Sequence, residues 1–282
     1  MQPVGSFFEA EVPLNETIKH FYCIQSAPNA TTTVQHLAPN LEMMIVFNFG
    51  NPVRISFGSE VFSEKKIEQV AILGPLRKML NYELLPESDV IIIVFNPNGF
   101  YRLFQIPMDE ITGEDVIDPD ELLKITGFKT LWETLKGLPV LNDRIQLLKD
   151  YGTAFIQKAD DATAPLTAGI SYFHNPMIQP VRAIAHDSDL SERTIQLRFK
   201  KYLGYSPKEL LRFIRFKQVI NCIQSAETTE VDWHALIEQF AYHDQSHLIK
   251  DFNFYLGTTP QKFVRDILGK EFCVTRRVGD AL

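Results

Sequence analysis

Side chains suited to reading DNA bases recur at helical spacing between positions 193 and 200. They are Arg193, Gln196, Leu197 and Lys200. A guanidinium group reads guanine, a side-chain amide reads adenine, and an aliphatic tip packs against thymine methyl groups. Arg198, Lys200 and Lys201 lie near enough on the same helix for phosphate contacts. These residue types predict a helix that enters the major groove of double-stranded DNA.

The opposite face of this segment is apolar, so the helix has a side to bury. Ile195, Phe199, Tyr202 and Leu203 recur at helical spacing. A two-faced helix of this kind also occurs in ordinary bundles, where the polar face is simply solvated. That alternative would explain a lone basic residue well, but it does not explain why the segment is duplicated.

The segment occurs twice in the chain, at an offset of 53 positions. The first copy reads Ile195-Gln-Leu-Arg-Phe-Lys-Lys-Tyr-Leu-Gly-Tyr-Ser-Pro207, and the second reads Leu248-Ile-Lys-Asp-Phe-Asn-Phe-Tyr-Leu-Gly-Thr-Thr-Pro260. Upstream the offset becomes 52, so that Ile184-Ala185 aligns with Leu236-Ile237. One additional turn residue accounts for the difference. The repeat predicts two copies of one structural unit.

Each copy has the sequence features of a helix-turn-helix unit. In the first copy, residues 181–186 form a short helix, 187–189 form a turn, and Ser191 is the N-cap of the second helix. Gly204 supplies the left-handed residue that ends this helix, and Ser206-Pro207 begins a long one. We predict a first unit at about 181–203, a linker helix at about 207–223 and a second unit at about 233–256.

The repeated part resembles the AraC/XylS-type transcriptional regulators. The resemblance rests on Ile184-Ala-His-Asp-Ser-Asp-Leu-Ser-Glu-Arg-Thr-Ile-Gln-Leu-Arg-Phe199 with Gly204-Tyr-Ser-Pro207, and on Asp244-Gln-Ser-His-Leu-Ile-Lys-Asp-Phe252 with Gly257-Thr-Thr-Pro260. It covers residues 165–268 or so. It implies a bacterial regulator in which two helix-turn-helix units, joined by a linker helix, read two successive major grooves on one face of DNA.

The resemblance also assigns base-reading positions in both units. In the first they are Arg193, Gln196 and Leu197; in the second they are Gln245, Ser246, His247 and Lys250. Some positions depart from the family pattern. Leu197 stands where a basic residue is common, Ala241 where the second turn has glycine, and Asn253-Phe254 where a basic pair is usual. We therefore expect the first unit to supply most of the affinity for DNA.

The first 120 residues predict short β-strands. Segments rich in β-branched and aromatic residues end at turn signals such as Gly50-Asn-Pro52 and Gly74-Pro75. The segments are 41–50, 53–57, 69–73 and 89–95. Their pattern predicts an antiparallel barrel or sandwich. This part resembles, more loosely, the barrel-like sensor domains attached to the same family, which implies a cupin-like barrel.

The difference between the halves predicts an α+β chain of two domains. Asp118-Pro119 is a helix start, and residues 128–136 and 142–158 have apolar residues at helical spacing. The stretch 159–165 has the composition of a linker. We expect a β-barrel-like sensor and dimerisation domain with trailing helices at 1–160, and an all-α tandem helix-turn-helix domain at 163–282. The two helical segments are candidate contacts of a homodimer.

Charge is distributed unevenly along the chain. The net charge of −7, taken alone, disfavours a nucleic-acid partner. Residues 1–176 contain 13 basic and 22 acidic residues, whereas 182–217 contain nine basic and four acidic residues. Residues 218–282 contain six basic and nine acidic residues. A local basic segment, rather than the sum, marks a nucleic-acid site, and this one coincides with the first unit.

Other chemistries have little support in the sequence. Cys23, Cys222 and Cys273 lack the spacing of a zinc site or a disulfide framework and fit a reducing cytoplasm. The N-terminal half offers His20 and His36 without the ligand cluster of a metal cupin. Phosphate-loop, nucleophile-elbow and metalloprotease motifs are missing from the sequence. We expect no cofactor, no metal, no catalytic activity, no signal peptide and no membrane span.

The sequence thus predicts a sequence-specific, DNA-binding transcription regulator of the cytoplasm. We expect a small-molecule effector at the N-terminal domain, at residues that the sequence does not identify, and a contact with RNA polymerase. One alternative is a small-molecule-binding or enzymatic cupin-like protein whose helical domain mediates protein contacts only. Another is a regulator that has lost DNA binding and titrates a partner, which the acidic second unit would suit.

Overall fold

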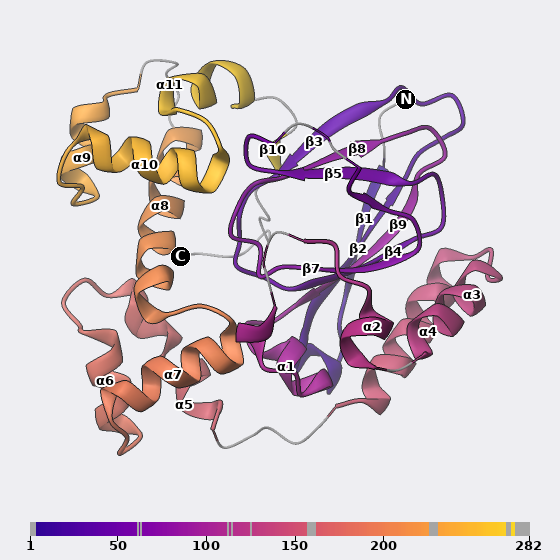
Figure 1. Cartoon of the computed structure of the whole chain (residues 1–282), viewed down its shortest axis with the longest axis horizontal. Coiled ribbons are helices and arrows are strands. Elements are labelled where there is room, and N and C mark those ends of the chain that lie inside the picture. Colours follow the sequence, from indigo (N-terminus) through magenta and orange to yellow (C-terminus); the bar gives the residue numbers. More distant parts are fainter. Residues whose placement is uncertain are drawn as a thin grey trace.

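The computed structural model describes residues 4–60, 62, 64–111, 113, 115–124, 126–156, 162–225, 231–268 and 272–273. Two β-sheets form most of the N-terminal part, and helices form the C-terminal part beside them (Figure 1). This confirms the α+β class. Residues 159–161 of the predicted linker lie outside the described residues, so the boundary near residue 160 stays a prediction.

The first sheet is antiparallel throughout and has the order β1-β2-β9-β4-β7. Its strands are β1 (Val4–Glu9), β2 (Ile18–Gln25), β9 (Asp89–Phe95), β4 (Met44–Asn48) and β7 (Val70–Leu73). The central strand β9 is a continuous apolar run because both of its faces are covered. The strands expected around 41–50, 69–73 and 89–95 are therefore confirmed.

The second sheet has the order β10-β3-β8-β5-β6. Its strands are β10 (Phe272–Cys273), β3 (Thr33–Leu37), β8 (Leu80–Leu84), β5 (Val53–Phe57) and β6 (Lys66–Ile67). Among the described residues, no strand pairing joins the two sheets, so the predicted antiparallel domain is confirmed as two open sheets, the sandwich of the two predicted architectures. The strand β10 comes from the C-terminal part of the chain and runs parallel to β3, which is an exception to the all-α character predicted for residues 163–282.

The alternation of side chains along β4 and β9 divides the N-terminal part into two apolar cores. Met44, Val46 and Val94 face the second sheet. Phe47 and Phe95 face the other way, toward the helices that cover the first sheet. These helices are α1 (Gly99–Phe104), α2 (Pro119–Leu123), α3 (Gly127–Lys136) and α4 (Leu141–Ala154).

Polar contacts hold the covering helices in place. The indole of Trp132 in α3 donates to the carbonyl of Asn48 at 2.7 Å, and Arg144 in α4 pairs with Asp89 at 2.6 Å. The Asp118 carboxylate caps α2 by accepting from the backbone amides of Asp120 and Glu121, as predicted. The helices expected at 128–136 and 142–158 are present, although α4 ends at residue 154.

The C-terminal part consists of seven α-helices within the described ranges, with α8 running between two helix pairs (Figure 1). They are α5 (Ala164–Ala168), α6 (Pro180–Asp187), α7 (Glu192–Leu203), α8 (Pro207–Ser225), α9 (Trp233–Gln239), α10 (Gln245–Leu256) and α11 (Pro260–Lys262). Within those ranges, none of the helices combines the length and apolar character needed to cross a membrane.

Candidate DNA interface and ligand pocket

The first helix-turn-helix unit consists of α6 and α7. The hydroxyl of Ser191 accepts from the backbone amide of Thr194 at 3.0 Å and caps α7, and Gly204 ends this helix at φ +81°. The backbone amide of Leu190 donates to the carbonyl of Ala185 at 2.9 Å and closes the turn between the helices. The predicted N-cap and the predicted left-handed glycine are both confirmed.

The two faces of α7 separate as the sequence indicates. Its buried residues are Ile195, Phe199, Tyr202 and Leu203. Arg193, Gln196, Leu197, Lys200 and Lys201 are all exposed. Leu197 leaves 58% of its surface exposed, so its aliphatic tip is accessible from solvent.

Arg198 differs from the other basic residues of α7. Its guanidinium group is half-buried and donates to the carbonyl of Ala162 at 3.3 Å. This contact ties α7 to the segment that leads into the helical part. The role of Arg198 in phosphate binding stays a prediction. In this structure its side chain also anchors α7 to the segment at Ala162.

The second unit consists of α9 and α10. The Asp244 carboxylate accepts from the backbone amide of His247 at 2.7 Å and caps α10. Gln245, Ser246 and Lys250 are exposed, whereas His247 is half-buried with its ring 5.3 Å from that of Tyr242. Three of the four expected base-reading side chains of this unit are therefore open, and the imidazole is held against the turn.

A buried carboxylate connects α10 to α8. Asp251 is fully buried and accepts from the Arg212 guanidinium at 2.7 Å and from the Tyr242 hydroxyl at 2.8 Å. Arg215 lies 3.9 Å from the same carboxylate. A buried charge persists only when it is paired and hydrogen-bonded, and here both conditions are met. The ion network sets the angle between the second unit and the linker helix.

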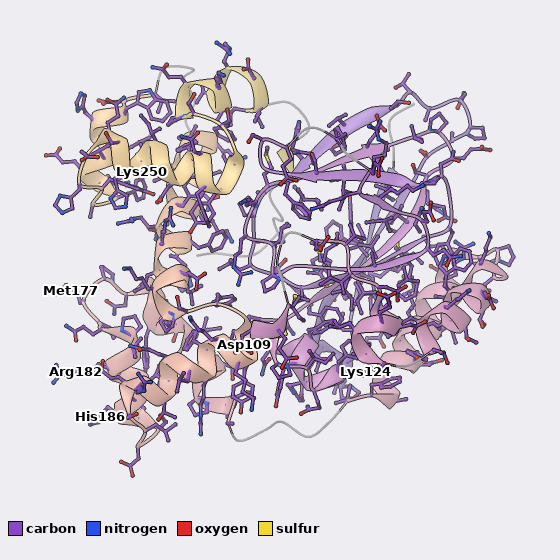
Figure 2. The ribbon with its side chains drawn as sticks, viewed as in Figure 1. Asp109, Lys124, Met177, Arg182, His186 and Lys250 are labelled. Carbon is purple, nitrogen blue, oxygen red and sulfur yellow. The ribbon has the colours of Figure 1, made fainter. Side chains whose placement is uncertain are left out.

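A concave surface lies between the two units and along α8, with a volume of about 1120 Å³. Lys208, Arg212 and Arg215 line it, together with His247 from α10. In Figure 2, Lys250, Arg182 and His186 lie on the side of the helical part that is turned away from the sheets. Basic side chains of the linker helix and an imidazole of the second unit therefore share one concave surface.

A pocket of about 290 Å³ lies between the two sheets. Its walls are mostly aliphatic and come from both sheets, as Val46, Ile55, Leu73 and Val94 illustrate. None of the 18 lining residues is a lysine, arginine, aspartate or glutamate. Such a pocket suits a ligand that is largely apolar and carries no full charge.

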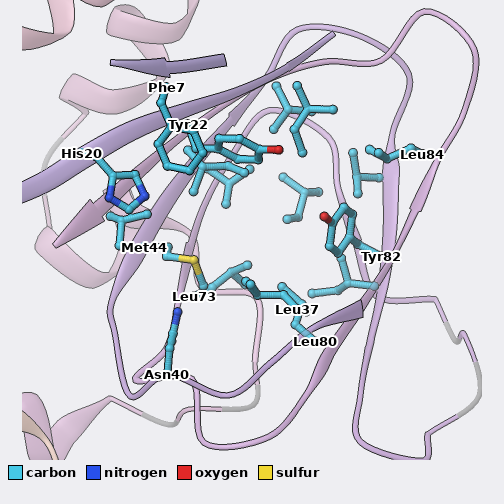
Figure 3. A pocket seen from close by; sticks show the side chains of 18 residues that line it. Phe7, His20, Tyr22, Leu37, Asn40, Met44, Leu73, Leu80, Tyr82 and Leu84 are labelled. Atoms are coloured by element: carbon cyan, nitrogen blue, oxygen red, sulfur yellow. The ribbon is translucent and has the colours of Figure 1, made fainter. Parts of the chain in front are cut away.

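A few polar groups interrupt the apolar walls. Figure 3 shows the hydroxyl groups of Tyr22 and Tyr82 directed into the enclosed space, with His20 and Asn40 at one side of it. Phe7 of the edge strand β1 also lines the pocket, although 61% of its surface is exposed. A ligand would find one or two hydrogen-bonding partners here, and Phe7 stands where the pocket meets solvent.

The described part of the chain shows neither a cluster of metal-ligating side chains nor an activated cysteine. No group of three or more histidine, cysteine or acidic side chains gathers there. Cys23 is a free buried thiol, and its burial raises the pKa to about 12, so the reactive thiolate is disfavoured. The side chain of Cys273 lies outside what the structure describes.

Comparison with known families gives two matches. Residues 184–266 match a family described as a helix-turn-helix domain, and this range contains the first unit from the middle of α6 onward, the linker helix and the second unit. The C-terminal part is an AraC/XylS-type helix-turn-helix domain. Residues 7–117 match a family described as a domain of unknown function, DUF6597, which spans both sheets as far as residue 117.

Solved structures similar to this chain include those of ToxT from Vibrio cholerae. An apo variant from strain SCE256 has a TM-score of 0.38 and 13% identity, covering 87% of this chain and 97% of that one. The unsaturated-fatty-acid-bound form has a TM-score of 0.37 and 12% identity, covering 94% and 96%. The AraC-like transcriptional activator CuxR has a TM-score of 0.30 and 10% identity, covering 73% and 78%. No curated protein matches the chain.

Several residues of the helical domain and of the pocket between the sheets could not be identified from the sequence. Asp251 is a single acid in a helix, and nothing in the local sequence signals its two arginine partners. The pocket residues come from strands far apart in the chain, so no spacing marks them. Alternation along β4 and β9 was the available signal, since the residues facing the pocket occupy every second position.

Proposed function

We propose that this chain is a sequence-specific DNA-binding regulator of transcription, with both helix-turn-helix units contacting one duplex. The observation that carries the proposal is the pair of capped recognition helices, α7 and α10, whose polar side chains are exposed. Arg193, Gln196 and Leu197 read bases in the first major groove. Gln245, Ser246, His247 and Lys250 occupy the corresponding positions for the second groove.

Phosphate contacts supply the affinity that does not depend on sequence. Lys200 and Lys201 are exposed side chains in the last turn of α7, and Arg198 adds a third cationic group when it leaves the carbonyl of Ala162. The basic residues concentrate at 182–217, and the second unit lies in an acidic segment. We therefore expect the first unit to contribute most of the affinity, and the second unit to read bases weakly or to contact only the DNA backbone.

The proposal is tested by selecting duplexes from a random library with the full chain. We expect an enriched motif with two half-sites about 10 base pairs apart, one for each recognition helix. Fluorescence anisotropy then compares the selected duplex with a scrambled one. An affinity ratio near one, or failure to enrich any motif, would show that the domain does not read sequence.

We further propose that the pocket between the sheets receives the effector. Its apolar walls, which contain no lysine, arginine or acidic side chain, favour a neutral, largely apolar molecule that forms hydrogen bonds with Tyr22 or Tyr82. A carboxylate or sulfonate would be buried there without a lysine or arginine to pair with, which costs free energy. The effector class is therefore a neutral molecule with an aromatic or aliphatic body and a single polar group.

Two related dyes test the effector class. N-phenylnaphthylamine is neutral, and anilinonaphthalenesulfonate is similar in shape and carries a sulfonate. We expect the neutral dye to bind the full chain with enhanced fluorescence and the sulfonate to bind at least about tenfold more weakly. The variant Leu37→Trp should fill part of the pocket and weaken binding, whereas Val140→Trp, at an exposed position, should not. Equal binding of the two dyes would contradict the uncharged-ligand class.

We also propose a homodimer that forms through α3 and α4, with RNA polymerase as a further partner of the DNA-bound form. These helices lie on the side of the sheets away from the helical domain (Figure 1), and Val140, which is half exposed, sits between them. Sedimentation equilibrium should give twice the chain mass, and Val140→Asp should shift the equilibrium to monomer. A monomer at all concentrations would exclude the dimer.

A further inference from the structure

One short segment connects the ligand pocket to both recognition helices. It comprises residues 74–79, which we call the strap, and it runs between β7 and β8. The residues at its two ends, Leu73 and Leu80, both line the pocket. A change in pocket shape therefore acts on the strap from both of its ends.

Backbone hydrogen bonds fix the middle of the strap to another wall of the pocket. The carbonyl of Leu76 accepts from the amides of Asn40 at 3.1 Å and Leu41 at 3.0 Å. The amide of Leu76 donates to the carbonyl of Glu42 at 3.0 Å. Asn40 itself lines the pocket, and Leu76 is fully buried. The strap thus moves with the pocket wall and not independently of it.

Pro75 and Arg77 of the strap hold the end of α7. The guanidinium of Arg77 donates to the carbonyl of Gly204, the residue that ends α7, and lies 3.8 Å from the Glu209 carboxylate in α8. Pro75 packs so closely on Gly204 that a methyl group added to this glycine would lie 2.8 Å from the proline Cγ. Glycine at this position therefore allows the approach of the strap as well as the left-handed turn.

Met79, the last residue of the strap, holds the end of α10. The amide of Met79 donates to the carbonyl of Tyr255, in the last turn of α10, at 2.7 Å. The carbonyl of Met79 accepts from the amide of Gly58 at 2.8 Å. A methyl group on Gly257 would overlap the backbone of Gly58 and Ser59, so the glycine that ends α10 is also seated against the sheets.

We propose that the strap transmits occupancy of the pocket to both recognition helices, and this inference rests on the regulatory function proposed above. Both helices are held at their C-terminal ends, while most of their base-reading residues lie in the N-terminal halves. Each helix is a rigid rod of about 18 Å, so a displacement at the held end moves the reading end. A ligand that favours one strap position selects one spacing of the two helices.

Hydrogen exchange of the full chain measures this connection with N-phenylnaphthylamine as the pocket ligand. We expect saturating dye to slow exchange at least twofold in peptides covering 73–80, 200–206 and 253–258. Peptides of α3 should not change, which separates a local connection from general stabilisation. The affinity for the selected duplex should change about fivefold or more when the dye is bound.

Variants of the strap separate its contact with α7 (the first branch) from its contact with α10 (the second branch). Arg77→Ala should abolish the response at 200–206 and keep it at 73–80 and at 253–258, because Met79 holds the second branch through its backbone. Arg54→Ala removes an arginine whose partner, Glu83, lies within the same sheet, and it should leave all three responses intact. If Arg77→Ala proves poorly folded, Arg77→Lys should still weaken the 200–206 response relative to wild type.

The outcomes separate the connection from the function. Slowed exchange confined to the strands, an intact 200–206 response in Arg77→Ala, or no dye binding at all would each overturn the proposal. Sequence-specific DNA binding that persists alongside any of these results would leave the regulator function standing. If the dye slows exchange in all three peptides but the chain binds no DNA, the connection between pocket and helices would stand and the proposed regulator function would be overturned.

Discussion

In each turn of the two helix-turn-helix units, one residue other than glycine adopts the left-handed backbone conformation. Asp189 in the first turn has φ +54°, and Ala241 in the second has φ +52°. Aspartate tolerates this conformation because its short polar side chain bonds locally, whereas alanine has no such compensation. The departure from glycine at Ala241, visible in the sequence, therefore carries a cost in stability.

Ala241→Gly should raise the free energy of unfolding by about 0.5–1 kcal/mol, since it removes left-handed strain against a smaller entropic penalty. Asp189→Gly is the matched control and should gain less. Denaturant titration of the full chain, with the second unit followed through its nearby Trp233, measures both. A loss of stability in Ala241→Gly would mean that the methyl group packs favourably.

Tyr242 makes the second unit sensitive to alkali. The pKa of its hydroxyl is raised well above the usual value near 10. Burial is the larger cause, and the negative charge of Asp251 is the second. Because the folded state retains the proton more strongly, its contribution to stability is complete below about pH 10 and is lost as pH rises beyond that.

Tyr242→Phe should therefore cost about 1–3 kcal/mol at pH 7, because the buried carboxylate loses a donor, and should reduce the loss of stability above pH 10. Tyr172→Phe is the control, since Tyr172 bonds Asp187 at the surface. Thermal unfolding between pH 7 and 11 gives both values. An unchanged alkaline slope would indicate that other groups, such as Tyr205 and Tyr255, dominate the titration.

At the scale of elements, local signals allowed the helical domain to be predicted well. Ser191 and Gly204 act within one turn of the chain, so the bounds of α7 follow from sequence alone. The pocket and the ion network depend on which faces meet in space, and residues such as Asp251 and Arg212 carry no local mark of that meeting. The choice between a barrel and a sandwich stayed open for the same reason, because local sequence indicates strands and turns but not whether the sheet edges join.

The angle between α8 and α10 depends on the buried carboxylate. Asp251→Ala should destabilise the protein by about 1–3 kcal/mol, because the buried Tyr242 hydroxyl loses its acceptor and the half-buried guanidinium groups of Arg212 and Arg215 lose their partner. Asp266→Ala removes an exposed partner of Arg265 and should cost under about 1 kcal/mol. Urea unfolding compares the two variants. Equal small losses would show that the network is solvated and does not fix α10.

At the scale of the whole molecule, the net charge of −7 conceals two different surfaces. The acidic N-terminal part lies beside the helical domain, and the basic stretch at 182–217 belongs to the first unit and α8. Binding to DNA should therefore weaken steeply with salt. Lys200→Ala should lower the slope of log affinity against log salt by about 0.9 and weaken selected and scrambled duplexes alike. Anisotropy at several salt concentrations measures this slope.

The central claim is that α7 reads bases, and the most direct measurement is the affinity of Arg193→Ala for the selected duplex and for single-base variants of its first half-site. The substitution should cost about 1–3 kcal/mol on the selected duplex and remove the preference at one base position. Lys200→Ala, measured in parallel, should keep that preference. If Arg193→Ala binds the selected duplex and its variants as wild type does, α7 is not the recognition helix.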